Sequence, residues 1–356
     1  MMRTDNLLSL KIVPELYEAD RLELIDFTKL HSEMMAVERQ FINGLLRYYK
    51  PNRVLEVGVS RGAGTVTILN AILDLPNTNL VSIDRLEFFY GDKCTPVGSE
   101  AKTLFPDISD TKWKLYTGVD PSEVLPDLAG TFDFLVLDSQ HAHPVESFNF
   151  LCALPYLNDG AIVIMHDISL YFHYLYSSAP RILMSAVAAE KLFVSKEYAP
   201  INVLGELAHN IVAFQIDKDT RRYIENVFHG LMYSWEIFLP DDVRLVRKLL
   251  VNHYPDELIK IFDRAFELNQ ACKKHIDNLI IGQCGHSGIL HRGACMQFDS
   301  HTVGQYGYSG ISHLEAVMQF FELKERIRAL ENSTSWRITK PIRAVKNIFN
   351  RIFGAI

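Results

Sequence analysis

Several features that would narrow the function are absent from this sequence. The five cysteines are an odd number scattered from Cys94 to Cys295, which excludes a small domain held together by a dense disulfide framework. The chain has a net charge of −7 and therefore no excess of basic residues to bind nucleic-acid phosphates, so we expect no nucleic-acid partner. No stretch reaches membrane-spanning length, and residues 1–20 lack the apolar core of a signal peptide. We therefore expect a cytoplasmic protein.

The chain is long and apolar enough for one main globular domain with an appendage, at 356 residues and 48% hydrophobic. The spacing over about residues 20–50 predicts an amphipathic helix that ends at Lys50, because Pro51 disfavours helix in the residue before it. Short apolar runs then alternate with helix-length segments, which is typical of βαβ units. The runs cover residues 53–57, 79–84, 113–116, 132–138 and 160–167, with 191–195 and 210–217 as candidates for a final hairpin.

These runs are nearly continuous in Val, Ile and Leu, as expected when helices cover both faces of a parallel sheet. We therefore predict an α/β fold with a Rossmann-like, doubly wound, mainly parallel seven-stranded sheet over residues 35–217, after a helical segment over 1–34. A helical extension over 218–281 and a glycine-rich linker over 282–312 should follow. Residues 313–356 predict a coiled-coil-like helix and a basic amphipathic tail.

The turn after the first predicted strand carries the most specific signal. Its sequence is E-V-G-V-S-R-G-A-G over residues 56–64, and a predicted helix follows. Glycines at such a turn let the backbone and a helix N-terminus approach a ligand closely. The spacing differs from the dinucleotide fingerprint, and Glu56 would repel a pyrophosphate but suits an ammonium or sulfonium group. Asp84 ends the second strand, where an acid can accept both hydroxyls of a ribose, although the glycines by themselves also fit a plain tight turn.

Together these residues resemble motifs I and II of class I S-adenosylmethionine-dependent methyltransferases, in which E-V-G-x-x-x-G precedes an acid at the end of the next strand. The resemblance covers roughly residues 35–217 and implies that S-adenosylmethionine is the cofactor. It also implies that Gly58, Ser60 and Gly62 line the methionine part of the cofactor near Glu56 and that Asp84 holds the ribose.

A second group of polar residues follows the fourth and fifth predicted strands. Asp138 ends one run and is followed by His141, and the next run ends in His166 and Asp167. The carboxyl ends of neighbouring parallel strands lie at one edge of a sheet, where ligands bind. Charge at that rim needs a partner, and a divalent cation is the economical one. The alternative is that Asp138 is an acid on the cofactor side and His141 an ordinary loop histidine.

These strand ends are similar to the D-G-x-H-x-Y and H-D signatures of methyltransferases related to macrocin O-methyltransferase and cephalosporin hydroxylase, with catechol O-methyltransferase nearby. The resemblance implies Mg²⁺ or a similar divalent cation, with Asp138, His166 and Asp167 as its ligands. It implies that His141 acts as a general base in catalysis, together with Asp138. The sequence departs from the signature glycine, acid and tyrosine at Ser139, Gln140 and His143.

The C-terminal residues predict an interaction surface. From residue 332 basic side chains accompany apolar ones spaced by four and three, which indicates a basic amphipathic helix. Residues 331–343, ENSTSWRITKPIR, resemble tails of bacterial glycosyltransferases and other surface-polysaccharide assembly proteins. The resemblance implies glycosyltransferase partners. The alternatives are packing on the protein's own core, a homo-oligomer contact, and peripheral contact with the inner face of the membrane. Four residues could be zinc ligands, namely Cys284, His286, His291 and Cys295. Their spacing matches no standard zinc site, so we favour a flexible loop over a zinc site.

The leading hypothesis is therefore a metal-assisted O-methyltransferase that acts on a sugar hydroxyl in bacterial surface glycan biosynthesis. A non-catalytic methyltransferase-like module of a glycan-assembly complex is one alternative, and a natural-product O-methyltransferase is another. A hydroxylase related to the cephalosporin enzyme would need a redox partner that the sequence does not reveal.

Overall fold

The computed structural model describes residues 6–172, 177–195, 209–237 and 240–284. The chain divides into two units, residues 1–305 and 306–356, and the second lies wholly outside the described residues. The expected C-terminal helices and most of the expected glycine-rich linker therefore lie outside them as well. Among the described residues, no helix is both long and apolar enough to cross a bilayer.

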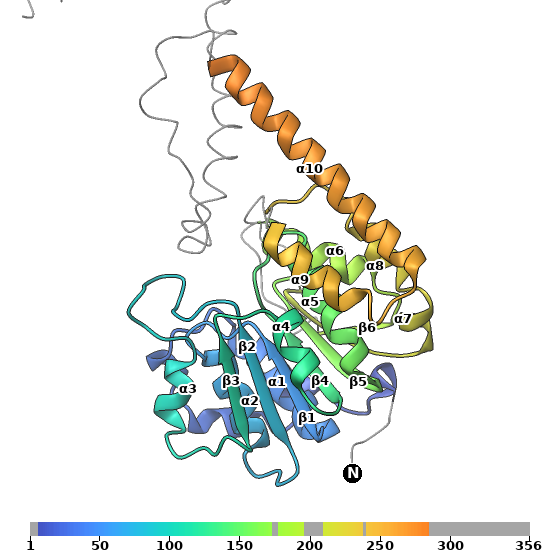
Figure 1. Ribbon diagram of the computed structural model, residues 1–356. Helices are drawn as coiled ribbons and strands as arrows, with labels where there is room; N and C mark the ends of the chain where they lie inside the picture. The colour runs from blue at the N-terminus through green and yellow to red at the C-terminus, as the bar shows by residue number, and fades with distance from the viewer. Residues whose placement is uncertain (1–5, 173–176, 196–208, 238–239, 285–356) are drawn as a thin grey trace, which may run out of the picture. The chain divides into compact units, whose positions relative to one another are not determined.

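A seven-stranded sheet lies at the centre of the first unit, with the strand order β3-β2-β1-β4-β5-β7-β6 (Figure 1). The strands are β1 (Arg53–Val57), β2 (Asn79–Asp84), β3 (Trp113–Thr117), β4 (Phe132–Leu137), β5 (Leu157–His166), β6 (Lys191–Phe193) and β7 (Ile211–Gln215). Strands β1 to β5 pair in parallel, whereas β7 is antiparallel to both β5 and β6. The predicted Rossmann-like, mainly parallel sheet is confirmed. Because the strand order reverses between β1 and β4, their carboxyl ends flank the point where such sheets bind ligands.

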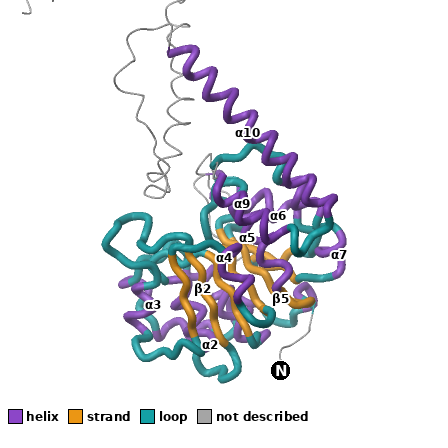
Figure 2. The backbone as a smooth tube through the Cα atoms, viewed as in Figure 1, coloured by secondary structure: helices purple, strands orange, loops and turns teal. Residues whose placement is uncertain are grey.

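Helices cover both faces of this sheet (Figure 2). One face carries α1 (Ala36–Tyr49), α2 (Ala63–Ile72) and α3 (Ser99–Leu104). The other carries α4 (Pro121–Val124), α5 (Val145–Ala153) and α6 (Ala179–Ala186). The predicted helical extension consists of α7 (Lys218–Arg222), α8 (Glu225–Gly230), α9 (Pro240–Leu250) and α10 (Asp256–Cys284). Buried residues of α8, α9 and the first turns of α10 join the core of the second face.

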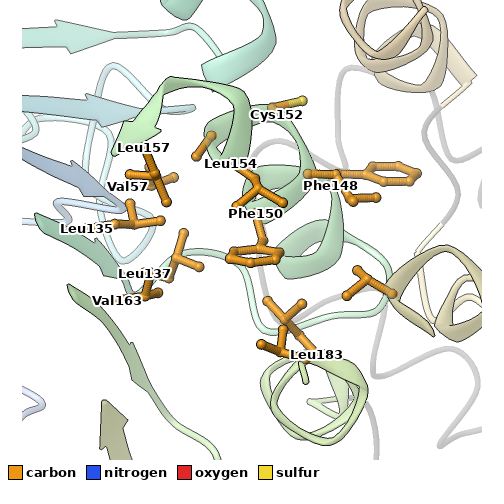
Figure 3. Packing of buried hydrophobic residues seen from close by; sticks show 14 of the residues in the cluster. Val57, Leu135, Leu137, Phe148, Phe150, Cys152, Leu154, Leu157, Val163 and Leu183 are labelled. Atoms are coloured by element: carbon orange, nitrogen blue, oxygen red, sulfur yellow. The ribbon is translucent and has the colours of Figure 1, made fainter. Parts of the chain in front are cut away.

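Side chains of the central strands alternate between the two cores. Along β4, Phe134 and Val136 belong to the core with α1 and α2, whereas Leu135 and Leu137 belong to the core with α5. Figure 3 shows Leu137 close to Phe150 of α5. Since both faces are buried, every position of the strand is apolar or occupied by a paired acid, which explains the continuous apolar runs in the sequence.

The helix expected over about residues 20–50 begins only at Ala36. The preceding residues form the 3₁₀ turns η1 (Leu7–Ser9), η2 (Pro14–Leu16), η3 (Ala19–Leu24) and η4 (Phe27–Lys29). These turns pack on α1, where Asn43 Nδ2 donates to the Glu18 carbonyl at 3.0 Å and Arg47 pairs with the Glu18 carboxylate at 2.6 Å. Their apolar spacing therefore reflects packing on α1 rather than a continuous helix. The predicted end of the helix at Lys50 is confirmed.

Gly44 provides a test of this N-terminal packing. A Cβ on Gly44 would lie 1.8 Å from the Pro14 carbonyl oxygen, a backbone clash that no side-chain rotation relieves. We expect Gly44→Ala to displace the turns and to destabilise the protein by about 1–3 kcal/mol, measured by thermal unfolding and by faster proteolysis of the N-terminal segment. The control is Gly230→Ala, whose Cβ would make an ordinary contact 3.5 Å from Ile182. Equal stability of both variants would contradict the packing.

Candidate functional site

The turn between β1 and α2 has a backbone that favours glycine at two positions. Gly58 and Gly62 have φ of 93° and 103°, and Ser60 is also left-handed at 54°. A Cβ on Gly58 would lie 1.9 Å from the carbonyl oxygen of Asp138. Position 58 therefore requires glycine for two reasons, its φ and the close approach of the chain that leaves β4.

Glu56 is buried beneath this turn, with only 2% of its surface exposed. Its carboxylate accepts hydrogen bonds from Ser82 Oγ at 2.6 Å and from Thr65 Oγ1 at 2.9 and 3.0 Å. Burial raises the pKa of Glu56 to about 8, against the opposing effect of these hydroxyls, and the nearby acids Asp138 and Asp84 add to the rise. A cationic ligand beside Glu56 would favour its ionised form.

Asp84 holds the turn from the end of β2. One carboxylate oxygen accepts the backbone N–H groups of Val59 at 2.8 Å and Ser60 at 3.0 Å, and the other accepts that of Leu86 at 2.8 Å. Burial raises the pKa of Asp84, although the three hydrogen bonds oppose the rise. Since a carboxylate offers about four acceptor positions, one remains for a ligand while the others fix the turn.

A hollow of about 530 Å³, open to solvent, lies beside the glycine turn. Of the expected cofactor residues, Glu56, Gly58 and Ser60 line the hollow, whereas Gly62 and Asp84 lie outside its lining. Residues 31–34 complete the wall, which the sequence did not indicate, and Asp138 also lines it.

Asp138, His141 and Asp167 converge at the carboxyl edge of the sheet, and we call these three residues the rim. One nitrogen or oxygen atom from each lies within 4.8 Å of the others. His141 Nε2 lies 3.0 Å from Asp167 Oδ2. The three side chains are 24%, 23% and 16% exposed, so a ligand in solvent can reach them. Two carboxylates and an imidazole form a donor set that suits a divalent cation.

His166 lies on the buried side of the rim, with its side chain 2% exposed. Its Nδ1 makes a 3.2 Å hydrogen bond with Asp138 Oδ1 and lies 3.4 Å from Asp167 Oδ1, while Nε2 lies 3.1 Å from Glu38 Oε2. Both ring nitrogens therefore contact carboxylates. Of the three residues expected as metal ligands, the structure brings Asp138 and Asp167 to the accessible edge beside His141 and places His166 behind them.

The carboxylates around the two imidazoles set their charge. Burial lowers the pKa of His166, but Asp167, Asp138 and Glu38 outweigh burial and hold this pKa well above its usual range. The same balance, with Asp167 as the main carboxylate, raises the pKa of His141 well above its usual range. Burial opposes ionisation of Asp167, yet the two imidazoles hold its pKa well below the usual range. The rim and His166 thus form ion pairs with each other.

Three supporting residues were not anticipated from the sequence. Glu146 of α5 accepts hydrogen bonds from the N–H and Oγ of Ser139, both at 3.1 Å, so the serine that replaces the signature glycine holds the loop after β4. Asn210 Nδ2 donates to Asp167 Oδ1 at 2.8 Å. Glu38 contacts His166 from α1. Glu146 gives a usable sequence signal, a charged residue within an apolar helix, whereas Glu38 and Asn210 meet partners that are remote in sequence.

Residues 55–168 match the protein family described as a methyltransferase domain. This range lies within the predicted methyltransferase domain, residues 35–217. The matched residues include Glu56, the glycine turn, Asp84 and the whole rim. A search of curated proteins gave no match to the chain.

Solved methyltransferase structures are similar to part of the chain. One is the O-methyltransferase TomG from Streptomyces achromogenes in complex with SAM, at 16% identity and a TM-score of 0.39, covering 59% of this chain and 92% of TomG. Another is an O-methyltransferase from Bacillus cereus with SAH, at 13% identity and a TM-score of 0.39, covering 59% of this chain and 93% of the other. The Podospora anserina methyltransferase PaMTH1, with SAH bound, has 14% identity and a TM-score of 0.40, and the match covers 56% of this chain and 88% of PaMTH1.

The raised pKa of Glu56 predicts a specific pH dependence of stability. The unfolded chain releases this proton near pH 4.5, whereas the folded protein keeps it until about pH 8, so ionisation of Glu56 lowers stability as the pH rises through this window. Glu56→Gln lacks this titration. Since each tenfold change in proton affinity is worth about 1.4 kcal/mol, we expect the wild type to lose at least about 2 kcal/mol more than the variant between pH 5 and 9.

Denaturant unfolding of the ligand-free proteins at a series of pH values measures this difference. Other titrating groups are common to both proteins and cancel in the comparison. Parallel stability curves for wild type and Glu56→Gln would show that Glu56 ionises normally in the fold.

Proposed function

We propose that this chain is an S-adenosylmethionine-dependent O-methyltransferase assisted by a divalent cation at the rim. The observation that supports this most directly is that Asp138 both lines the hollow beside the glycine turn and belongs to the rim. A methyl donor in the hollow and an acceptor at the rim would therefore meet at Asp138. Methyl transfer needs such proximity, with reacting atoms about 3–3.5 Å apart.

The residues around the hollow fit the cofactor. S-adenosylmethionine supplies a methyl group on a positively charged sulfonium centre. Glu56 is a buried acid that suits the positive charges of its methionine part, and Asp84 keeps one acceptor position for a ribose hydroxyl. A Cβ on Gly64 would lie 3.5 Å from Glu56 Oε1, so glycine at this position leaves space next to the acid.

The rim residues fit a hard cation. Asp138 and Asp167 would hold the ion, with oxygen ligands of the kind that Mg²⁺ prefers. When bound, such an ion orients a hydroxyl and lowers its pKa. Without the ion, the carboxylates keep His141 protonated, with its Nε2 3.0 Å from Asp167 Oδ2. Once the ion draws on their charge, the pKa of His141 would fall and Nε2 of the neutral imidazole would accept the proton of the acceptor hydroxyl. The carboxylates that raise the pKa of His141 are the ones proposed to share their charge with the ion.

The acceptor that we propose is a sugar hydroxyl of a bacterial surface glycan or its lipid-linked precursor. Support comes from residues 331–343, whose sequence resembles tails of polysaccharide-assembly proteins and which lie outside the described residues. The same basic amphipathic segment would contact a glycosyltransferase partner. The alternatives are that this segment contacts a second copy of the chain or an anionic membrane surface.

Cofactor binding is tested at Asp84. We expect Asp84→Ala to weaken S-adenosylmethionine binding by about 1–3 kcal/mol in calorimetry, because the ribose loses an acceptor and the turn loses its support. The control is Asp92→Ala, since Asp92 accepts only from Cys94 and Thr95 within its own loop among the hydrogen bonds identified in the described chain. Unchanged affinity of Asp84→Ala would remove Asp84 from the site, and a wild type that does not bind S-adenosylmethionine would overturn the proposed function.

Metal assistance is tested by chelation. We expect EDTA to abolish transfer of labelled methyl groups to glycan extracts and Mg²⁺ or Mn²⁺ to restore it, because the rim offers hard oxygen ligands. Asp167→Asn should act like chelation, while the exposed Asp159→Asn, which removes an ion pair with Arg221, should not. His141→Asn should lose about 10²–10⁴-fold in rate, as for a general base. Full activity in metal-free buffer would rule out the ion.

A further inference from the structure

We propose that Glu38 of α1 is a positioning residue for the rim and that it acts through His166. The proposal rests on the proposed metal-assisted function and adds a residue outside the family-matched range 55–168. Glu38 contacts neither the hollow nor the three rim side chains in the contacts identified for the described chain. Its effect would pass through the imidazole of His166.

The contacts form a continuous series from α1 to the rim. Glu38 Oε2 lies 3.1 Å from His166 Nε2, on the far side of the ring from the rim. On the near side, His166 Nδ1 lies 3.2 Å from Asp138 Oδ1 and 3.4 Å from Asp167 Oδ1. The ring thus has a carboxylate beside each nitrogen, and Nδ1 lies next to both acids that would hold the ion.

The burial of Glu38 is difficult to explain by its other contact alone. Glu38 Oε2 also accepts the N–H of Met35 at 2.6 Å, which satisfies one donor at the start of α1. A neutral glutamine would serve that purpose equally well. Glu38 is nevertheless an acid with 1% exposure, and no described residue forms a hydrogen bond with its Oε1. A buried charge needs an opposite charge, and His166 provides it.

The position of His166 decides the separation of the two rim acids. Asp138 and Asp167 would repel each other across the rim if no donor lay between them. Removing Glu38 would take the carboxylate away from the buried His166 Nε2, so the ring would lose the electrostatic restraint on that side. The same change would loosen the start of α1, immediately after residues 31–34 that line the hollow. Mutation of a residue that supports a metal ligand from behind typically lowers metal affinity about 10–100-fold.

The test compares Glu38→Met, Glu38→Gln and Glu15→Met in the full-length chain. Methionine removes both acceptors at similar length, whereas glutamine keeps an oxygen that can accept from His166 and Met35. Glu15 is a matched control because it is also 1% exposed and accepts a backbone N–H, from Ser195 at 2.7 Å, away from the rim. The probe is Mn²⁺ alone, measured by electron paramagnetic resonance, and S-adenosylmethionine affinity is measured beside it.

We expect Glu38→Met to weaken Mn²⁺ binding about 10–100-fold, Glu38→Gln to weaken it less, and Glu15→Met to leave it unchanged. S-adenosylmethionine affinity should stay the same in Glu38→Gln and Glu15→Met, whereas Glu38→Met, which also removes the acceptor of the Met35 N–H beside the hollow, should weaken it. Equal effects of Glu38→Met and Glu15→Met, or wild-type Mn²⁺ affinity in Glu38→Met, would overturn the proposal. If Glu38→Met does not fold, Glu38→Gln against Glu15→Gln decides by the same criterion.

Crystal structures of the wild type and the Glu38 variants separate this proposal from the proposed function. If the wild type does not bind Mn²⁺, the proposed metal assistance is wrong. The crystal structures still test the positioning role, because they show whether the His166 ring moves. We expect the His166 ring to turn away from Asp138 in the variants and the two rim acids to separate. An unchanged ring and unchanged rim in Glu38→Met would overturn the positioning role whatever the metal does.

Discussion

Acidic side chains gathered at one edge of the sheet are the constraint on which this site depends. An isolated ionised group in a protein interior costs several kcal/mol, so each acid must either gain donors or lose its charge. Glu56 lies under hydroxyl donors and has a pKa raised to about 8. Asp84 takes its donors from the backbone of the glycine turn. Asp138 and Asp167 share the imidazole of His166, and Asp167 also contacts His141 and Asn210. Because these acids are stabilised in three different ways, they differ in how many acceptor positions they still offer to a ligand.

The backbone sets the distance between the proposed donor and acceptor positions. The N–H of Asp138 donates to the Val57 carbonyl at 3.0 Å, and the Asp138 carbonyl occupies the space that a side chain on Gly58 would need. The end of β4 is therefore fixed against the glycine turn without the help of a flexible side chain. A site that is held by strands in this way keeps its groups within the roughly 0.5 Å that catalysis requires.

The sequence predicts what depends on local pattern and fails where a distant contact decides. The central strands were predictable because their apolar runs are bounded by turns, and Asp138 and Asp167 because parallel strands end at one edge. The N-terminal turns were not, since their form depends on docking against Arg47 and Asn43 of α1. His166, predicted as a metal ligand, lies behind Asp138 and Asp167 next to Glu38, and no local pattern indicates a contact with a residue so remote in sequence.

The helical extension also contributes to the site, although it lies outside residues 55–168. The Glu236 carboxylate accepts from the N–H of His143 at 2.7 Å and from Ser178 Oγ at 2.5 Å. In return, the N–H groups of Glu236 and Ile237 donate to the His143 carbonyl at 2.9 and 3.2 Å. His143 follows His141 in the loop after β4, so these bonds restrain the loop that carries the proposed base. Because both the N–H and the carbonyl of His143 are hydrogen-bonded, the loop has little freedom to move the proposed base away from a substrate. This restraint comes from the segment between α8 and α9.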